Sequence, residues 1–257
     1  MILCLDVGNS HIYGGVFEGD QLRLTFRKTS KQGASSDEYG LFFRSVLREN
    51  GFDPEAVRNV ALCSVVPEVV YSINSACQKY FGQAPFELKA GAKTGLKIRY
   101  RNPLEVGADR IANAIAATGM FPGEDVLVLD LGTATTVDAI TAERDYLGGV
   151  IIPGLRMSME ALDRGTARLK SVEIRRPGRC LGRATAESIQ SGLYFGHLGA
   201  LREILRGVRD DAFDGRSPRV IATGGFAGLF ADAGLYDEAV PDLVLRGLVT
   251  ALAMNLS

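Results

Sequence analysis

One turn motif occurs twice in this chain, once in each half, and it constrains the possible folds more than any other feature. In the first half, the apolar run Ile2–Val7 ends in Asp6-Val7-Gly8-Asn9-Ser10, and a second strand-like run follows. In the second half, the apolar run at residues 126–129 leads into Asp130-Leu131-Gly132-Thr133, again before a strand-like run. Both segments have the order strand, Asp-x-Gly-[Asn/Thr], strand. The sequence therefore predicts a duplicated α/β fold, with two equivalent hairpin turns facing each other across a cleft.

Apolar periodicity predicts the elements around the two turns. In the first third, we expect the order β-β-β-α-β-α, with strands at residues 2–7, 12–17, 22–28 and 60–66 and helices over residues 37–47 and 67–81. In the second half, we expect strands at residues 126–129, 136–140, 146–152 and 220–222, and helices over residues 157–163, 187–209 and 243–255. Because the pattern begins again, the sequence predicts two domains, residues 1–118 and 119–257. Residues 31–36 form the expected mobile loop.

Composition and charge argue against several classes of function. The formal net charge is −1, so the chain lacks the positive field that is typical of nucleic-acid-binding proteins. Its apolar runs are shorter than the ~18–20 residues that a membrane span needs, and Asp6 interrupts the first run, unlike a signal peptide. The cysteines (Cys4, Cys63, Cys77 and Cys180) have no C-x-x-C spacing that would suggest a zinc or redox site. We therefore expect a cytoplasmic protein with reduced thiols that binds neither nucleic acid nor a membrane.

The chemistry of the two turns favours binding of phosphate. Glycine in a tight turn lets backbone N–H groups approach an anion, and neighbouring side chains such as Asn9, Ser10 and Thr133 add donors. The aspartates, Asp6 and Asp130, supply hard oxygen ligands suited to Mg²⁺, held directly or through water. A triphosphate needs cover on both sides, so two matching turns are a stronger signal than one. A Walker A motif and a G-x-G-x-x-G unit are both absent from the sequence.

A third glycine-containing segment, Thr223-Gly224-Gly225-Phe226, follows a late strand and leads into an expected helix. In a nucleotide-binding protein, this glycine pair would let the adenosine lie against backbone. Alternatively, a strand-to-helix turn needs glycine for its geometry alone. The presence of the two phosphate turns favours the nucleotide role.

Transfer of a phosphoryl group also needs a base near the accepting hydroxyl. The best candidate is Asp109, in the segment Gly107-Ala108-Asp109-Arg110 at an expected helix start, where backbone N–H groups favour a carboxylate. The neighbouring Arg110 could pair with a substrate carboxylate by a two-pronged contact. The alternative is a surface aspartate at a helix N-terminus beside a solvated arginine.

Further motifs accompany these segments in a fixed order. In sequence, the motifs are Asp6-Val7-Gly8-Asn9-Ser10, Tyr100-x-Asn102-Pro103, Gly107-Ala108-Asp109-Arg110, Asp130-x-Gly132-Thr133-Ala134-Thr135-Thr136-x-Asp138, Gly148-Gly149-x-Ile151-x-Pro153-Gly154, Glu187-Ser188-Ile189-Gln190-Ser191-Gly192 and Thr223-Gly224-Gly225. The ordered set spans nearly the whole chain and resembles the signature of the type III pantothenate kinase family.

The resemblance implies a fold and an activity. The family belongs to the actin/hexokinase/Hsp70 superfamily, with two ribonuclease-H-like halves, each a mixed sheet flanked by helices, and forms homodimers. Its members transfer the γ-phosphoryl group of ATP to the primary hydroxyl of pantothenate, which gives 4'-phosphopantothenate in the first step towards coenzyme A. The resemblance therefore implies ATP as co-substrate with Mg²⁺ and a monovalent cation, K⁺ or NH₄⁺.

The resemblance also implies roles for single residues. Asp109 matches the proton acceptor for the pantothenate hydroxyl, and Asp130 the ligand of the monovalent cation, with Mg²⁺ near Asp6. Thr133 matches a nucleotide contact, and Thr185 a residue that reaches pantothenate, in some members from the partner subunit. The residues implied to bind phosphate or nucleotide are Asp6, Val7, Gly8, Asn9, Ser10, His11, Ile12, Tyr13, Thr133, Gly224 and Gly225. Those implied to line the pantothenate site are Tyr100, Gly107, Ala108, Asp109, Arg110 and Thr185.

The two histidines carry no predicted catalytic role. His11 stands where the family often has asparagine, and we expect it to be a turn residue. His197 lies inside a long helical pattern, where a packed or dimer-facing histidine is expected rather than a ligand.

Two other functions compete with this interpretation. One is a kinase for another small hydroxylated metabolite on the same scaffold, which only the motifs around Tyr100 and Asp109 argue against. The other is a non-catalytic, ATP-binding regulatory protein, an idea weakened by the joint presence of Asp6, Asp109 and Asp130.

Overall fold

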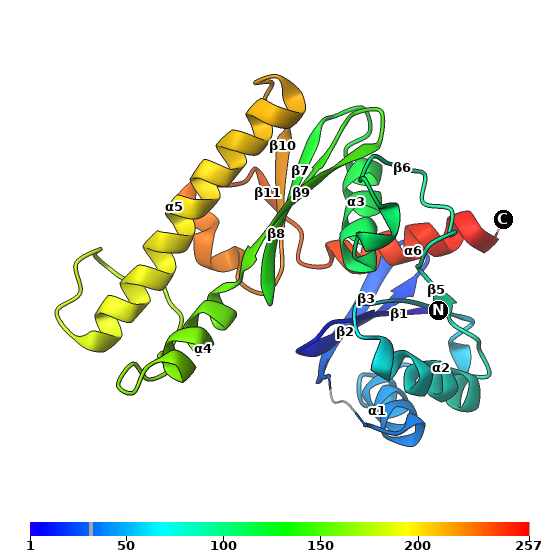
Figure 1. Cartoon of the computed structure of the whole chain (residues 1–257). Coiled ribbons are helices and arrows are strands. Elements are labelled where there is room, and N and C mark those ends of the chain that lie inside the picture. The colour runs from blue at the N-terminus through cyan, green and yellow to red at the C-terminus, as the bar shows by residue number, and fades with distance from the viewer. Residues whose placement is uncertain (31–32, 257) are drawn as a thin grey trace. The chain divides into compact units, whose positions relative to one another are not determined.

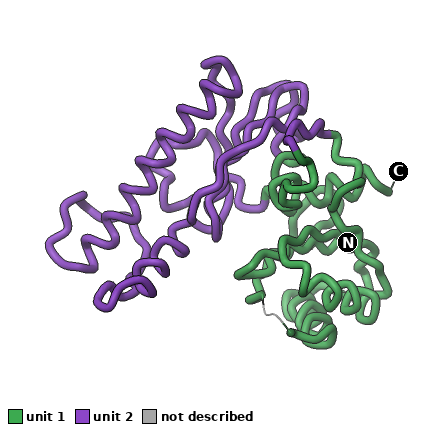
Figure 2. The backbone as a smooth tube through the Cα atoms, viewed as in Figure 1, with its two compact units in different colours: residues 1–95, 102–116, 243–257 green, residues 96–101, 117–242 purple. Residues whose placement is uncertain are grey.

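The computed structural model describes residues 1–30 and 33–256, which form two compact units (Figure 2). Unit 1 contains Met1–Gly95, Asn102–Ala116 and Leu243–Ser257, and unit 2 contains Leu96–Arg101 and Ala117–Asp242. Lys31 and Gln32, in the expected mobile loop, lie outside the described residues.

Unit 1 is built on a five-stranded mixed sheet with the order β3-β2-β1-β4-β5. The strand β1 pairs antiparallel with β2 and parallel with β4, while β2 pairs antiparallel with β3 and β4 parallel with β5. The strands are β1 (Ile2–Val7), β2 (His11–Glu18), β3 (Gln21–Thr29), β4 (Asn59–Ser64) and β5 (Phe86–Glu87). The predicted strands of this half are confirmed, and only the two-residue β5 was not predicted.

Helices cover both faces of this sheet (Figure 1). On one face lie α1 (Ser36–Glu49) and α2 (Pro67–Phe81), and on the other the start of α3 (Ala108–Met120) and α6 (Leu243–Leu256). Local sequence sets these helices: Ser35 and Glu38 form a capping box before α1, and Pro67 begins α2. Short 3₁₀ turns occur at Pro54–Ala56 and Pro103–Glu105.

The strand β1 is buried on both faces, and its alternation decides which residues meet which helices. Leu3, Leu5 and Val7 belong to the hydrophobic core that includes residues of α1 and α2. Residues at even positions point to the opposite face. There, a Cβ on Gly15, the partner of Cys4 in β2, would lie 2.7 Å from Leu245 of α6. Asp6 therefore lies on the face that α3 and α6 cover.

Unit 2 repeats this topology. Its six-stranded sheet has the order β11-β10-β7-β8-β9-β6, in which β7, β8, β9, β10 and β11 take the places of β1 to β5 with the same parallel and antiparallel senses. Only β6, parallel to β9, is additional. The strands are β6 (Lys97–Ile98), β7 (Val126–Leu131), β8 (Ala134–Ile140), β9 (Asp145–Pro153), β10 (Arg219–Thr223) and β11 (Glu238–Ala239). The predicted duplication is therefore confirmed in the strand order.

The helices of unit 2 are α4 (Leu155–Gly165) and α5 (Thr185–Phe213), followed by the 3₁₀ helix η3 (Ala227–Ala233). A second hydrophobic core joins alternate residues of β7, including Leu127 and Leu129, to α5 and to Phe230 of η3. The segment after Gly224-Gly225 is thus a 3₁₀ helix rather than a longer α-helix. Among residues 1–30 and 33–256, none of the helices has the length and apolarity needed to cross a bilayer.

The last helix groups with unit 1, although the sequence placed residues 243–257 in the C-terminal half. In the structure α6 contacts β1 and β4, and a Cβ on Gly247 would overlap the backbone of Ala112 in α3. The reason is tertiary: the strongly apolar α6 covers the sheet face of unit 1 that α1 and α2 leave open. The predicted domain boundary between residues 118 and 119 stays a prediction about folding units.

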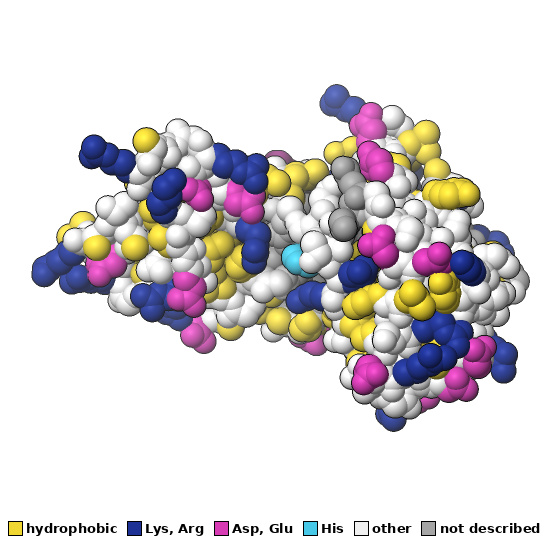
Figure 3. Space-filling view, turned by 90° about the horizontal axis from the view of Figure 1, so that it is seen from below, with side chains coloured by type: hydrophobic (Ala, Val, Ile, Leu, Met, Phe, Trp, Pro, Cys, Tyr) yellow, Lys and Arg dark blue, Asp and Glu magenta, His cyan; other side chains and the backbone are white. Residues whose placement is uncertain are grey.

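The surface carries charges of both signs. On the face shown in Figure 3, Lys and Arg side chains are interspersed with Asp and Glu. Many of the ion pairs join exposed groups, for example Lys79 with Asp37 at 2.7 Å. Such pairs contribute little to stability, so the two hydrophobic cores account for most of it.

The α3–α6 contact gives a test of packing in unit 1. In Gly247→Ala the new methyl group has no room beside Ala112, so we expect a loss of about 1–3 kcal/mol in the free energy of unfolding. Gly207→Ala in α5 is the control, because a Cβ there meets nothing within 4 Å. This control should gain about 0.5–1 kcal/mol from helix propensity alone. Urea unfolding of both variants checks the pair, and equal effects would contradict the packing argument.

Candidate active site

The first candidate phosphate turn joins β1 to β2 in unit 1. Asp6 is the next-to-last residue of β1 and pairs with Tyr13 in β2, and the Gly8 N–H donates to the His11 carbonyl at 3.0 Å. Asn9 and His11 are exposed, whereas Val7 and Ile12 are fully buried. Val7 and Ile12 therefore offer a ligand only their backbone groups, while the exposed residues can also use side chains.

Asp109 lies in the first turn of α3, as the sequence predicted. Its Oδ1 accepts a hydrogen bond from the Arg110 N–H at 2.8 Å, so the carboxylate folds back onto the helix N-terminus. A Cβ on Gly107 would clash with this same oxygen, which explains why a glycine precedes the helix. This hydrogen bond therefore holds the carboxylate in place beside the unpaired N–H groups of the helix N-terminus.

Cys63 is a buried neighbour of Asp6 in the sheet of unit 1. It lies next to Asp6 in the parallel pairing of β4 with β1, is fully buried, and its thiol donates to Asp6 Oδ1 at 3.4 Å. Burial raises the pKa of the Cys63 thiol well above its ordinary value, and the negative charges of Asp6 and Asp109 raise this pKa further. The thiol therefore contacts Asp6 and also experiences the negative charge of Asp109. Sequence analysis treated Cys63 only as a buried thiol, and pairing its strand with β1 would have revealed the contact.

Arg110 is buried, with only 7% of its surface exposed, and it interacts with other groups of the protein. The alternative of a solvated surface arginine is therefore wrong.

The second candidate phosphate turn joins β7 to β8 in unit 2. The Gly132 N–H donates to the Ala134 carbonyl at 3.2 Å, and the Thr133 carbonyl accepts from the Gly154 N–H at 3.2 Å. From the loop after β10, the Phe226 N–H donates to the Leu131 carbonyl at 3.0 Å. Three segments thus converge at this turn: the hairpin itself, the residue before α4, and the loop after β10.

The two glycines after β10 differ in what they accommodate. Gly224 has a φ of 88°, and a Cβ there would lie 2.5 Å from both Asp130 Oδ1 and the Leu131 carbonyl carbon. The fold itself therefore requires glycine at position 224. A Cβ on Gly225, in contrast, would meet nothing within 4 Å. The alternative that a turn needs glycine for its geometry alone therefore explains the glycine at position 224. At Gly225, space for an external group remains.

The other two predicted substrate residues, Tyr100 and Thr185, belong to unit 2, whereas Gly107 and Arg110 belong to unit 1. The Tyr100 ring lies 3.5 Å from where a Cβ on Gly148 would stand. Thr185 is the exposed first residue of α5 and lies on the wall of an apolar cavity of about 890 Å³. The cavity is lined by Pro153, Met157, Ser158, Ala161, Leu162, Leu169, Thr185, Ser188, Ile189, Gly192 and Leu193.

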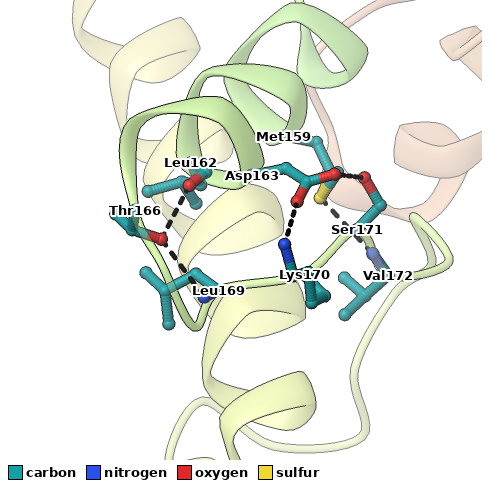
Figure 4. Close-up of polar contacts among 8 residues, drawn as sticks. All are labelled: Met159, Leu162, Asp163, Thr166, Leu169, Lys170, Ser171 and Val172. Carbon is teal, nitrogen blue, oxygen red and sulfur yellow. Dashed lines mark hydrogen bonds and ion pairs between the residues drawn. The ribbon is translucent and has the colours of Figure 1, made fainter.

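The segment after α4, which supplies Leu169 to this cavity, is held by polar contacts (Figure 4). The Thr166 hydroxyl donates to the Leu162 carbonyl at 2.9 Å and accepts from the Leu169 N–H at 3.1 Å. Asp163 accepts from Ser171 at 2.7 Å and pairs with Lys170 at 3.7 Å. The hydrogen bond from Ser171 is the main cause that lowers the pKa of Asp163 below its ordinary value.

The predicted metal ligands, Asp6 and Asp130, lie in different units. Within the described part of the chain, no three His, Cys, Asp or Glu side chains gather to form a metal site. Each aspartate would therefore be a single protein ligand, with phosphate and water oxygens completing the shell. This donor set fits Mg²⁺, which keeps several waters and binds through one or two carboxylates plus substrate phosphates.

His197 is a packed histidine, as predicted. It is buried, its Nε2 lies 3.1 Å from Thr135 Oγ1, and its ring lies beside Phe230. Burial lowers its pKa below the ordinary value, so the neutral ring is favoured at neutral pH.

Comparisons with known proteins decide the family. A family model described as type III pantothenate kinase matches residues 2–207. A type III pantothenate kinase of Legionella pneumophila (strain Corby) is 59% identical to this chain over 255 residues, which cover 99% of each protein. The chain belongs to the type III pantothenate kinase family. The resemblance inferred from the ordered motifs is thus confirmed over the full length.

Solved structures show the fold of this family member. A protein from Campylobacter jejuni, described as a Baf family transcriptional activator, has a TM-score of 0.62 at 19% identity, covering 99% of this chain and 98% of its own. A protein from Sinorhizobium meliloti, described as a 2-dehydro-3-deoxygalactonokinase, has a TM-score of 0.56 at 12% identity, covering 98% of both chains. At such identities the likeness concerns the fold alone. The predicted fold class, two ribonuclease-H-like halves of the actin and hexokinase type, is confirmed.

The glycine pair of this family member gives a direct test. Gly224→Ala introduces a methyl group at positive φ against Asp130, so we expect a loss of about 2–4 kcal/mol in the free energy of unfolding. Gly225→Ala is the matched control and should change it by less than about 0.5 kcal/mol. Thermal and urea unfolding of the two variants measure these changes in stability. Equal stability of the two variants would show that the close approach to Asp130 is not required.

Proposed function

We propose that this protein is an ATP-dependent pantothenate kinase, which transfers the γ-phosphoryl group of ATP to the primary hydroxyl of pantothenate. The product would be 4'-phosphopantothenate, in the first step of coenzyme A biosynthesis. The observation that carries the proposal is the 59% identity to a type III pantothenate kinase over the full length, in a chain that keeps Asp6 and Asp109. A common site is supported by Asp6, which lies on the sheet face that α3 covers, and by Asp109 in the first turn of α3.

The two aspartate turns hold the triphosphate in this proposal. Backbone N–H groups and the side chains of Asn9, Ser10 and Thr133 donate to phosphate oxygens. Mg²⁺ lies near Asp6 and a monovalent cation, K⁺ or NH₄⁺, at Asp130, and both offset phosphate charge. Gly225, which has open space beside it, lets the adenosine approach the backbone. Of the phosphate-binding run, Val7 and Ile12 contribute their backbone alone because both side chains are in the core.

Asp109 acts as the base in this proposal. Its hydrogen bond with the Arg110 N–H keeps the carboxylate at the helix N-terminus, where it can accept the proton of the pantothenate hydroxyl. Tyr100, Gly107, Ala108 and Thr185 line the pantothenate site, and Arg110 pairs with the substrate carboxylate. Catalysis then consists of positioning the hydroxyl and stabilising phosphate charge, which suits phosphoryl transfer.

The protein also forms a homodimer in this proposal, with a second copy covering the apolar surface around α4 and α5. Exposed apolar side chains there, Met157 at 43% and Leu181 at 75%, support a contact surface. Thr185 beside the cavity could then reach the pantothenate bound by the partner subunit. We place this activity in the cytoplasm, where ATP is available.

The two rival functions have less support. Neither a kinase for another hydroxylated metabolite nor a non-catalytic regulator explains the full-length identity of 59% to a type III pantothenate kinase together with the joint presence of Asp6, Asp109 and Asp130. We therefore expect pantothenate and ATP as the partners of this protein, and no nucleic acid.

The proposed activity has a simple test. Purified protein with Mg²⁺ and ATP should release ADP only when pantothenate is added, and the rate should rise with K⁺ or NH₄⁺ because a cation at Asp130 offsets phosphate charge. A coupled ADP assay measures both effects, with glucose and N-acetylglucosamine as alternative acceptors. Faster turnover of a sugar would favour the first rival, and no acceptor-dependent release would favour the second.

The role of Asp109 is tested by Asp109→Asn. Loss of the base should lower kcat by about 10²–10⁴-fold while the fold is kept. Asp53→Asn is a matched control, because Asp53 also accepts a backbone N–H at a helix start of unit 1, from Glu55 at 3.0 Å. The control should keep its turnover within about twofold. Near-normal turnover of Asp109→Asn, under conditions where chemistry limits the rate, would show that another group takes the proton.

A further inference from the structure

Cys63 occupies a defined place beside the first phosphate turn. The parallel register of β1 and β4 pairs Asp6 with Cys63, so both side chains lie on the same face of the sheet. The thiol is 0% exposed and donates to Asp6 Oδ1 at 3.4 Å, within the range expected for a sulfur donor. The side chain lies inside the protein, so a direct contact with substrate is excluded and any effect on the reaction must act through Asp6.

The second half of the molecule repeats this placement independently. There, the parallel register of β7 and β10 pairs Asp130 with Thr223, which is 3% exposed. In each sheet, the residue beside the turn aspartate is therefore a buried side chain that carries a hydrogen-bond donor, a thiol in one half and a hydroxyl in the other.

The surroundings of Cys63 explain why a donor is useful. Asp6 and Asp109 both contribute negative charge that acts on the buried Cys63 thiol. Rotation of the Asp6 carboxylate away from Cys63 would break the hydrogen bond with the thiol. A neutral donor fixed in the sheet opposes that rotation without adding a charge of its own.

We propose that Cys63 is a positioning residue for phosphoryl transfer, whose thiol holds the Asp6 carboxylate in the orientation that serves Mg²⁺ and the phosphates. This inference rests on the proposed kinase function and assigns Cys63 no direct part in the chemistry. It predicts that the hydrogen-bond donor at position 63 matters more than the shape of the side chain.

Two pairs of variants separate donor from shape. Cys63→Thr and Cys63→Val have nearly the same shape, but only threonine, the residue found at the equivalent position 223, keeps a donor. Cys63→Ser and Cys63→Ala form a smaller pair with the same difference. We expect the Thr and Ser variants to keep kcat within about threefold. The Val and Ala variants should lose about tenfold and need more Mg²⁺ for half-maximal rate, with the KM for pantothenate unchanged.

Cys4→Ala is the control for removal of a buried thiol from this face. Cys4 is also 0% exposed and lies on β1, but burial alone raises its pKa, with no carboxylate contributing. Its kcat and Mg²⁺ dependence should equal those of the parent protein. Circular dichroism and thermal unfolding identify any variant that is not folded. If a variant of the Thr/Val pair fails to fold, the Ser/Ala pair tests the inference, and the reverse.

The outcomes distinguish this inference from the proposed function. If the parent protein shows no pantothenate-dependent ADP release, the proposed function fails, and calorimetric binding of Mg·ATP to the same variants still tests the role of Cys63. If the parent is active and folded Cys63→Val or Cys63→Ala matches it in kcat and Mg²⁺ dependence, the inference is wrong. Equal losses in all four variants would also overturn it, because shape alone would then explain them.

Discussion

The structure depends on one constraint: a carboxylate lies next to the end of a strand that is otherwise buried on both faces. Leu3, Cys4, Leu5 and Val7 of β1 are fully buried, while Asp6 between them is only partly so. Burial of a charged group in that position costs free energy unless hydrogen-bond donors or cations contact it. The thiol of Cys63 is one such donor. The same strand–aspartate–turn arrangement recurs at Asp130, so each half of the molecule places one charge at the end of its central strand.

Close packing of backbone, rather than further charged groups, shapes the second turn. Gly224 approaches Asp130 and Leu131 so closely that no other residue fits, and Gly154 donates to Thr133 from the start of α4. These contacts bring three loops to one carboxylate and leave Gly225 with open space. The backbone of this turn is therefore fixed by its own hydrogen bonds and by close packing of the glycine loop.

Most long elements follow from local sequence, because strand alternation and helical apolar spacing are strong over such lengths. The exceptions have identifiable causes. The two-residue strands β5, β6 and β11 are too short to leave a periodic signal. The helix α6 was recognised as a helix, but its place in unit 1 depends on contacts with β1, β4 and Ala112, which lie far from it in the chain. Sequence spacing carries no information about such pairings.

The sequence by itself determined the family, the duplicated topology and the identity of the carboxylates at the two turns and at the start of α3, because these depend on the order of local motifs. Only the tertiary structure decided what surrounds them. It brought Cys63 beside Asp6, buried Arg110, and separated the structural Gly224 from the open Gly225. Those relations arise from strand register and close approach between distant segments, which a linear pattern of residues does not encode.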